Sequence, residues 1–217
     1  MAHARRSQGN ERGNAVVEFA LGFALFWVPL FLGTVVIGFN LIRAVQVTQV
    51  CRDAGHMYAS GIDFSQTTYQ NLLVDLAIGL NMTATGGNGV VILSTVMYVD
   101  SAACSAGGYS GNSCTNLNTT VFTRRVVVGN SGLPYSSAFG SPNSGDMDSS
   151  GNVSVVGYLT HTGNQVASFQ NTIPCFSSTS SVSCTQIAYI SEMFVTSPDT
   201  SWWSFLSTPT VNARSIF

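Results

Sequence analysis

The residue whose type and position most clearly suggest a chemical role is Glu18, a carboxylate at the edge of a long apolar run. From Phe19 to Ile42 no side chain carries a charge. An ionised carboxylate at hydrocarbon depth costs about 2.5–3.5 kcal/mol on insertion scales, and such groups usually pair or serve a function. Gly13 precedes Glu18 by five residues. We therefore take the segment from Gly13 to Phe19 as the first candidate site.

Four of the five cysteines bracket short polar segments. Cys104 and Cys114 enclose glycine and serine residues, and so do Cys175 and Cys184. Neither pair has the CxxC spacing of a zinc or redox site, so we expect disulfide-closed loops in an oxidising compartment. Four cysteines permit three different pairings. We prefer the one with two local bridges, Cys104–Cys114 and Cys175–Cys184. Cys51 is left over, either as a small apolar residue on a helix or as an inter-subunit disulfide.

A third candidate is the acidic stretch with Asp146, Asp148 and Ser150, followed by Gly151. Oxygen ligands at alternate residues before a glycine are typical of the first half of a calcium loop. The twelfth position, where a glutamate is expected, is Gly157, and no helix is predicted on either side. An ordinary polar turn is the preferred interpretation, and we expect no metal elsewhere.

The composition argues against several classes of protein. Only 8% of the residues are charged, the net charge is -2 and the chain has no lysine. We therefore expect no nucleic-acid partner and no Schiff-base or Walker A chemistry. His56 and His161 lack metal-ligand spacing, and no G-x-S-x-G motif occurs. We predict no enzyme activity, no cofactor and no small-molecule substrate.

The apolar run is long enough to cross a membrane. Its 24 residues span about 36 Å as a helix, against a hydrocarbon core of about 30 Å. Pro29 lies inside it and predicts a kink. The residues before the run include three arginines, Arg5, Arg6 and Arg12, and one acidic residue, Glu11. This excess predicts a cytoplasmic N-terminus. A plain signal anchor would explain these features but not Glu18.

The remaining pattern predicts an α+β domain beyond the membrane. One long helix is expected from Asn14 to about Ser60, and a second over residues 65–87, capped by Ser65. Strand-like runs cover residues 89–100, 120–130, 152–160, 185–197 and 210–217. Helices followed by strands predict an antiparallel sheet packed on the outer half of the first helix.

Gly13, Asn14, Glu18 and Phe19 together resemble the cleavage site of type IV prepilins and pseudopilins. The resemblance implies that a prepilin peptidase cuts after Gly13. Asn14 would then carry a new amino group, with a reference pKa of about 7.7–8.0. Glu18 of one chain could pair with that amine of a neighbour and set the register between subunits. The alternative is that Glu18 snorkels to the interface and pairs with Arg12 of its own chain.

Three segments extend the resemblance to TadE-like proteins of the tight-adherence (Tad) pilus machinery. They read ERGNAVVEFALGFALFWVPL, CRDAGHMYASG and AYISEMFVTSPDTSWWSFLSTPTVNARSIF, the last with Glu192, Phe194 and Pro198. The resemblance implies a pilin-like fold and a minor pilin that acts in pilus assembly at the bacterial inner membrane. Its partners would be other pilin-like subunits, the Tad assembly platform and the peptidase.

These expectations divide the chain into four parts. Residues 1–13 form a cleaved cytoplasmic leader, residues 14–42 a transmembrane helix, residues 43–62 its outer continuation and residues 63–217 the α+β domain. The outer parts are periplasmic or extracellular, and the protein either enters a pilus or stays at its base. The alternative function is a membrane-anchored or pilus-tip adhesin that binds through its disulfide-closed loops.

Overall fold

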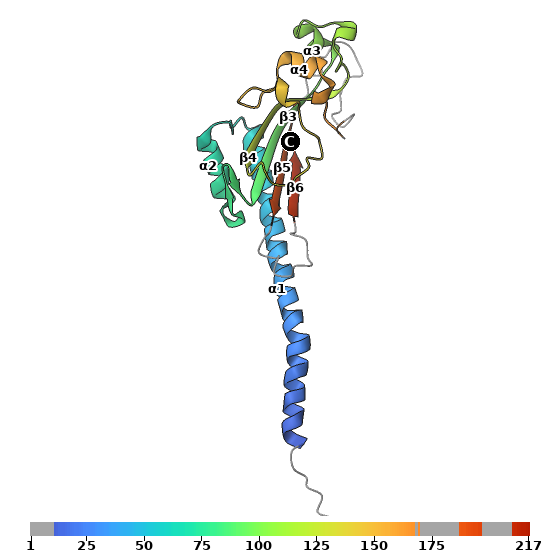
Figure 1. Cartoon of the computed structure of the whole chain (residues 1–217). Coiled ribbons are helices and arrows are strands. Elements are labelled where there is room, and N and C mark those ends of the chain that lie inside the picture. The colour runs from blue at the N-terminus through green and yellow to red at the C-terminus, as the bar shows by residue number, and fades with distance from the viewer. Residues whose placement is uncertain (1–10, 168, 170–186, 197–209) are drawn as a thin grey trace, which may run out of the picture. The chain divides into compact units, whose positions relative to one another are not determined.

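The computed structural model describes the backbone of residues 11–167, 169, 187–196 and 210–217, and the side chains of these residues from residue 15 onwards. Figure 1 shows the helices and strands in chain order. The chain divides into two units, Met1–Ile42 and Arg43–Phe217, and each is described by itself. Helix α1 contributes to both, because it runs without a break over Glu11–Ala59.

Helix α1 begins at Glu11 and ends at Ala59, two residues before Gly61. It continues through Pro29, and the kink expected there stays a prediction. After Ala59 the amide of Gly61 donates to Tyr58 O at 3.0 Å, and the amide of Ile62 donates to Met57 O at 3.1 Å. This pair of bonds is the Schellman arrangement, which needs a left-handed residue. Gly61 supplies it with a φ of +91°.

The second unit is built on one antiparallel sheet of four strands in the order β4-β3-β5-β6. Their bounds are β3 Gly89–Tyr98, β4 Thr120–Gly129, β5 Ile187–Thr196 and β6 Thr210–Ile216. The strands β3, β4 and β5 are rich in β-branched and aromatic residues, which pack well on a pleated surface. A bulge shifts the β3–β4 pairing between Thr95 and Val96. The predicted α+β class with an antiparallel sheet is confirmed.

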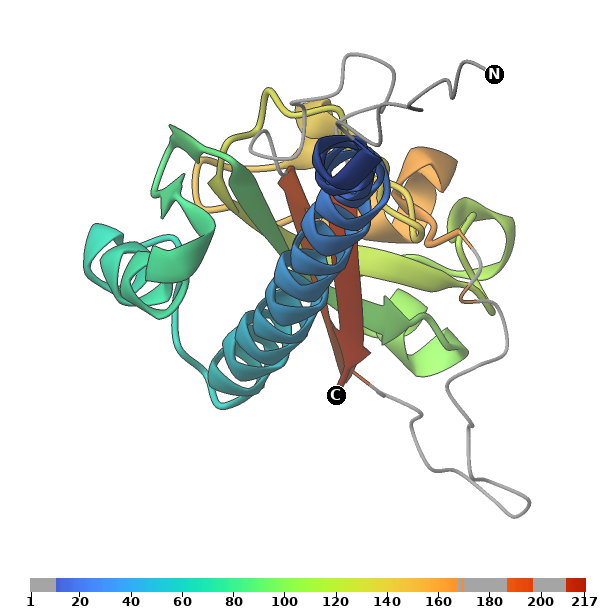
Figure 2. The same ribbon diagram turned by 90° about the horizontal axis from the view of Figure 1, so that it is seen from below.

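One face of this sheet packs on the C-terminal part of α1, which passes obliquely over the strands (Figure 2). Five α1 side chains are buried there: Val47, Val50, Cys51, Ala54 and Tyr58. The sheet contributes Val91, Leu93, Val126, Val128, Met193 and Val195. The α1 positions recur every three or four residues and the strand positions every two, so each element turns one side to this core.

The other face of the sheet is covered by loop segments. Leu133 and Tyr135 pack on a small cluster of Val90, Ile92 and Phe194. Further along, Phe139, Val153, Val166 and Phe169 pack on Val96, Phe122 and Ile190. The segment after β4, residues 130–154, therefore belongs to the core although it is rich in glycine and serine.

The predicted helix over residues 65–87 is shorter than expected. Helix α2 covers Thr67–Leu76, the 3-10 turn η1 covers Ile78–Leu80, and a hairpin of β1 Met82–Thr83 and β2 Gly86–Gly87 follows. Asn81 adopts a left-handed conformation with a φ of 51°, which ends the helical path. Ser65 is also not the cap, because Gln66 stands at that position and the Ser65 hydroxyl donates to Asp63.

The predicted strand over residues 152–160 is wrong, because most of this stretch forms helix α4, Val155–Thr160. Ser154 caps the helix by accepting a hydrogen bond from the Gly157 amide at 3.1 Å. A β-carbon on Gly157 would lie 2.7 Å from Asp146 Cβ, so this tight packing needs glycine. The other short helices are α3 Ser101–Ala106, η2 Gly111–Ser113, η3 Ser144–Asp146 and η4 Thr162–Asn164.

Candidate functional site

The first candidate site is the exposed N-terminal stretch of α1. Every side chain from Ala15 to Ile37 is exposed, including large apolar ones such as Phe19 at 74% and Leu25 at 77%. By length and composition this helix could cross a membrane, and the apolar window shows no burial inside the structure. Exposed apolar surface of this size is typical of membrane or protein contacts.

Glu18 shares one side of α1 with small and polar residues. Each residue turns the helix by about 100°, so Glu18, Gly22, Pro29, Gly33 and Asn40 fall within about 60° of one another. A β-carbon at Gly22 or Gly33 would meet nothing within 4 Å. Asn40 Oδ1 is buried and has no hydrogen-bond partner among the residues that the structure describes. This line of residues, which we call the Glu18 side, is where another helix could approach closely.

The proposed cleavage bond between Gly13 and Asn14 lies in the first turn of α1, because the helix begins at Glu11. The first four backbone amides of a helix have no hydrogen-bond partner inside it, so unwinding this turn to expose the bond breaks few hydrogen bonds. The side chains of Arg12 and Asn14 lie outside the described ones. Whether Glu18 pairs with Arg12 or with a neighbouring amine therefore stays a prediction.

The second candidate site is the disulfide-closed loop. Cys104 in α3 is bonded to Cys114, with the two Cα atoms 5.9 Å apart. The predicted local pairing of these two cysteines is confirmed. The second predicted pair, Cys175 and Cys184, lies outside the described residues.

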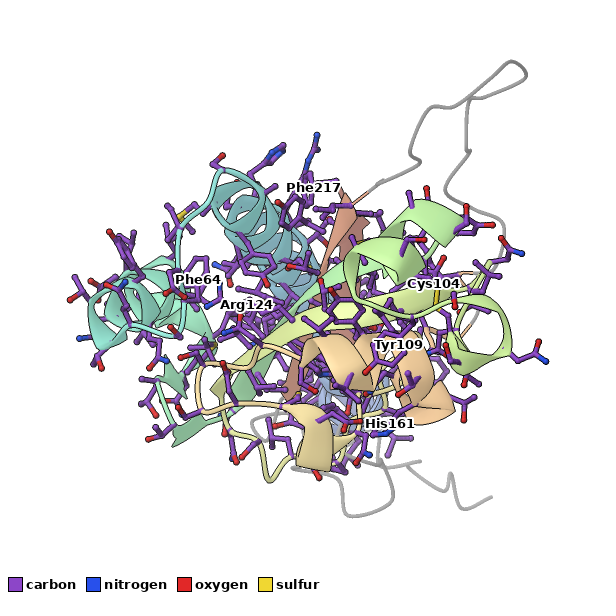
Figure 3. All side chains as sticks on the ribbon, turned by 90° about the horizontal axis from the view of Figure 1, so that it is seen from above. Phe64, Cys104, Tyr109, Arg124, His161 and Phe217 are labelled. Carbon is purple, nitrogen blue, oxygen red and sulfur yellow. A yellow bond between two sulfur atoms is a disulfide. The ribbon has the colours of Figure 1, made fainter. Side chains whose placement is uncertain are left out.

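The closed loop packs against α4 to form one end of the second unit, Arg43–Phe217, which we call the sheet unit. Tyr109 and Leu117 join Cys104, Cys114 and Leu159 in one apolar cluster. Figure 3 shows Cys104, Tyr109 and His161 gathered in this part of the molecule. We call the closed loop with α4 the loop end. Two segments that the sequence separates by about forty residues thus form a single surface.

A buried asparagine that the sequence analysis missed ties the loop end together. Asn116 is fully buried, and its amide donates to Tyr158 O and His161 O, both at 2.9 Å. Gln165 Nε2 donates to Asn116 Oδ1 at 2.9 Å. The side-chain NH₂ and carbonyl oxygen of Asn116 therefore have hydrogen-bond partners in backbone and side chains far along the sequence. An asparagine in a polar loop gives no local sign of such a role.

The calcium candidates are engaged in protein hydrogen bonds. Asp148 Oδ1 accepts from the amides of Ser150 and Asn152, each at 2.8 Å, which closes a turn. Among the described residues no group of three His, Cys, Asp or Glu side chains could hold a metal ion. The hydrogen bonds from Asn152, the largest effect, and from Ser150 lower the pKa of Asp148.

Asp146 makes hydrogen bonds with other residues than Asp148 does. Its carboxylate contacts His161 Nδ1 at 2.8 Å and accepts from Asn164 Nδ2 at 2.8 Å. These two hydrogen bonds lower the pKa of Asp146, with His161 the larger influence. These contacts fasten the segment before α4 to the residues after it. The structure thus places Asp146 and Asp148 in two separate networks.

Among the described residues the most deeply buried charged side chain is Glu192, in the middle of β5 and 1% exposed. The Ser137 hydroxyl donates to its carboxylate, and so does the Ala138 amide at 3.1 Å. Arg214 Nε donates to the same carboxylate at 3.1 Å. Glu192 therefore holds the segment after β4 onto the sheet. Its signal in the sequence is an acidic residue inside an apolar strand.

Arg124 and Arg125 lie on opposite faces of β4, as strand alternation predicts. Arg125 is 7% exposed, and its guanidinium donates to Gly140 O on the loop-covered face. Arg124 pairs with Asp63 on the α1 face. Beside that pair lies an open hollow of about 310 Å³, lined among others by Tyr58 and Tyr189.

Cys51 is fully buried in α1 and carries no disulfide. Its thiol donates to Ser191 O at 3.4 Å, and the Ser191 hydroxyl donates to Cys51 O at 2.8 Å. Burial raises the pKa of the Cys51 thiol. This environment fits the small apolar helix residue and not the inter-subunit disulfide.

No protein-family model, curated protein or solved structure matches the chain. A function must therefore be inferred from the Glu18 side of α1, the sheet unit and the loop end.

Proposed function

We propose that the chain is a TadE-like minor pilin that helps to assemble a Tad pilus or a related secretion system at a bacterial inner membrane. Residues 1–13 would face the cytoplasm and be removed by a prepilin peptidase. The observation that carries the proposal is one unbroken helix with an exposed apolar half, a carboxylate at its start, and an antiparallel sheet packed on its other half.

The chemistry of Glu18 explains how such a helix could take its place among others. Cleavage after Gly13 would leave a cationic amine on Asn14, one helical turn before Glu18. Four residues rise about 6 Å, so a neighbour displaced by that distance along the axis would bring its amine level with Glu18. Both charges are costly in hydrocarbon and tolerable as a pair. The pair would fix the axial register between subunits.

The composition of the Glu18 side supports helix packing there. Small residues let two backbones approach, and polar side chains hydrogen-bond between helices in a membrane. Gly22 and Gly33 leave open space beside the helix. A neighbouring pilin-like helix would cover these positions together with Glu18.

The test compares processing with partner recruitment for variants of the full chain. Glu18→Gln should be cleaved normally, because Glu18 lies more than a turn from the scissile bond. Its recruitment of pilin partners should fall by roughly 100-fold, since breaking a buried pair costs about 3–5 kcal/mol. Gly13→Val should remain full-length. An immunoblot for processing and a pull-down of partner pilins give the two readouts.

Asp53→Asn is the matched control, because it makes the same carboxylate-to-amide change at an exposed α1 position beyond the apolar run. It should be cleaved and should recruit partners at wild-type levels. Wild-type recruitment by processed Glu18→Gln would reject the register pair. Retention of Met1 beside an active prepilin peptidase would reject the minor-pilin assignment itself.

A second candidate function is an anchored adhesin, favoured by the surface of the loop end. Val155 and Val156 on α4 are 47% and 50% exposed beside the disulfide-closed loop. Adjacent exposed valines on a braced helix could contact a ligand surface. Replacing both by serine should leave assembly intact and reduce attachment if this function holds. Attachment at wild-type levels would argue against it.

A further inference from the structure

A row of three residues crosses the α1 face of the sheet at the point where α1 ends. Arg124 on β4 is the direct partner of Thr95 on β3, and Thr95 is the direct partner of Tyr189 on β5. Helix α1 ends at Ala59, and Tyr58 in its last turn contacts both Thr95 and Tyr189. The open hollow of about 310 Å³ lies here, and all of its lining residues belong to the sheet unit.

Two tyrosines held in a fixed arrangement form the aromatic part of the lining. Their ring centroids are 5.6 Å apart and the ring planes meet at 88°, the edge-to-face geometry that aromatic pairs favour. Tyr58 is 3% exposed, and its hydroxyl is hydrogen-bonded to the Thr95 hydroxyl at 2.8 Å. Tyr189 is half-buried. The ring of Tyr189 is therefore the aromatic surface that a ligand in the hollow can reach.

Arg124, labelled in Figure 3, has more hydrogen-bond donors than the described residues use. A guanidinium carries five N–H groups. Its Nη2 donates to Asp63, and its Nε has no partner among the residues that the structure describes. Asn152, joined to Arg124 by a β-bridge, is exposed, and its Nδ2 donates to Asp148 at 2.8 Å. The hollow thus offers hydrogen-bonding groups of a cation and an amide beside an aromatic ring.

The charges around the hollow nearly cancel, and this decides the charge of the ligand. Arg124 pairs with Asp63. Hydrogen bonds from Asn152, and to a smaller extent the charge of Arg124, lower the pKa of a second acid, Asp148. Gly61, which follows α1, also lines the hollow, and the C-terminal end of a helix carries a partial negative charge. An anion would find the guanidinium already compensated, and a cation would be repelled by it, so a neutral ligand is favoured.

We propose that the hollow binds the ring of a neutral saccharide, with the C–H groups of one sugar face on Tyr189 and the sugar hydroxyls on Arg124 and Asn152. A sugar ring combines an apolar face with hydroxyls around its edge, and each hydroxyl both donates and accepts. Small-molecule sites commonly measure about 300–1,000 Å³, so this hollow fits a short saccharide and not a long chain. The site belongs to the sheet unit and goes beyond the assembly role proposed for α1.

The test is saturation-transfer NMR on the full chain in an uncharged polyoxyethylene detergent, which brings no sugar into the sample. The probes are glucose, galactose, mannose and N-acetylglucosamine, each as the free sugar and as its methyl glycoside. Acetate and choline serve as an anionic and a cationic probe. At least one sugar should bind saturably with a Kd in the millimolar range, and its ring C–H protons should receive the strongest saturation, because they face Tyr189.

Substitutions separate the roles of the ring and the guanidinium. Tyr189→Leu removes the ring and should weaken sugar binding roughly 10-fold, whereas Tyr189→Phe keeps the ring and should bind like the wild type. Arg124→Lys keeps a cation for Asp63 but loses the planar fork, and it should weaken binding by a similar factor. Tyr98→Leu and Arg52→Lys make the same changes outside the hollow and should leave the Kd unchanged. Circular dichroism checks that each variant is folded.

Sugar affinities that are equal in the wild type, Tyr189→Leu and Arg124→Lys would overturn the inference, and so would the absence of saturable binding by every sugar. Binding of acetate or choline without binding of any sugar would also overturn it and assign the hollow to a charged ligand. Both sugar forms support the site. Binding of a methyl glycoside assigns the ligand to the end of a glycan chain, and binding of the free sugar alone assigns it to a monosaccharide in solution. None of these outcomes changes the cleavage or the register pair expected at α1.

Discussion

Arg214 Nε donates to Glu192 Oε1 at 3.1 Å across neighbouring strands, where the two residues are direct partners in the β5–β6 ladder. Glu192 is buried, whereas the Arg214 side chain is 41% exposed. The carboxylate therefore sits in the core with its cation at the surface. Since Ser137 and Ala138 bind the same carboxylate, one residue joins the edge strand, the central sheet and the covering loop.

Replacing Glu192 by glutamine should destabilise the fold. Arg125 lies on the same face, 7% exposed, and the Glu192 charge counteracts the effect of burial, which lowers the Arg125 pKa. Glu192→Gln removes that charge, and a buried guanidinium with less compensation destabilises the folded state. Denaturant unfolding of the detergent-solubilised chain measures the loss. Asp75→Asn, at an exposed site, should change little, and equal stabilities of the two variants would contradict the prediction.

The carboxylate of Asp63 should make the stability of the fold decrease in acid. Hydrogen bonds from Ser65, with a smaller contribution from Arg124, lower the pKa of Asp63 from 3.8 to about 2. A lowered pKa in the folded state stabilises it above the unfolded value, and this contribution is lost as pH falls from about 4 to about 2. The side chain is 35% exposed, so solvent screening limits the effect to about 1 kcal/mol.

The measurement is the difference in unfolding free energy between wild type and Asp63→Asn as a function of pH. The wild type should be the more stable near neutral pH, and the difference should shrink in acid because only the wild type has a titrating group here. A difference that stays constant below about pH 4 would show that this pKa is not lowered by folding.

Opening the Cys104–Cys114 disulfide should loosen the loop end more than the sheet. The bridge closes a loop with a sequence separation of 10, and a loop of this size contributes about 3 kcal/mol in the chain-entropy account. In the double serine variant, hydrogen exchange should rise in α3 and α4, which share the apolar cluster with the bridge. Uniformly faster exchange, with β5 and β6 equally affected, would contradict this local role.

Cys51 should resist alkylation in the folded chain. A thiolate is the reactive form, and burial raises the pKa of this thiol while the core blocks access. Peptide mapping after iodoacetamide should find Cys51 modified only in denaturant, whereas Val45→Cys, 57% exposed on the same helix, should react without it. A disulfide-linked dimer that disappears in Cys51→Ala would instead establish the inter-subunit bridge.

Local sequence determined the elements that depend on near neighbours. The apolar run and its helical continuation specify α1. Runs of β-branched and aromatic residues bounded by turn residues specify β3, β4 and β5, because the composition of a run is a property of each segment alone. The Cys104–Cys114 pairing follows from a short loop whose closure costs little entropy. The Gly13–Glu18 motif was equally visible, since it is a spacing along the chain.

The tertiary structure decided what depends on distant contacts. Residues 155–160 have the composition of a strand, yet they form α4 because Ser154 caps the helix and Gly157 fits against Asp146. Glu192 looks like an isolated acid in an apolar strand, and its partners come from a loop about 55 residues earlier and a strand about 22 residues later. A buried charge is tolerated only with partners in place, and folding alone brings them together.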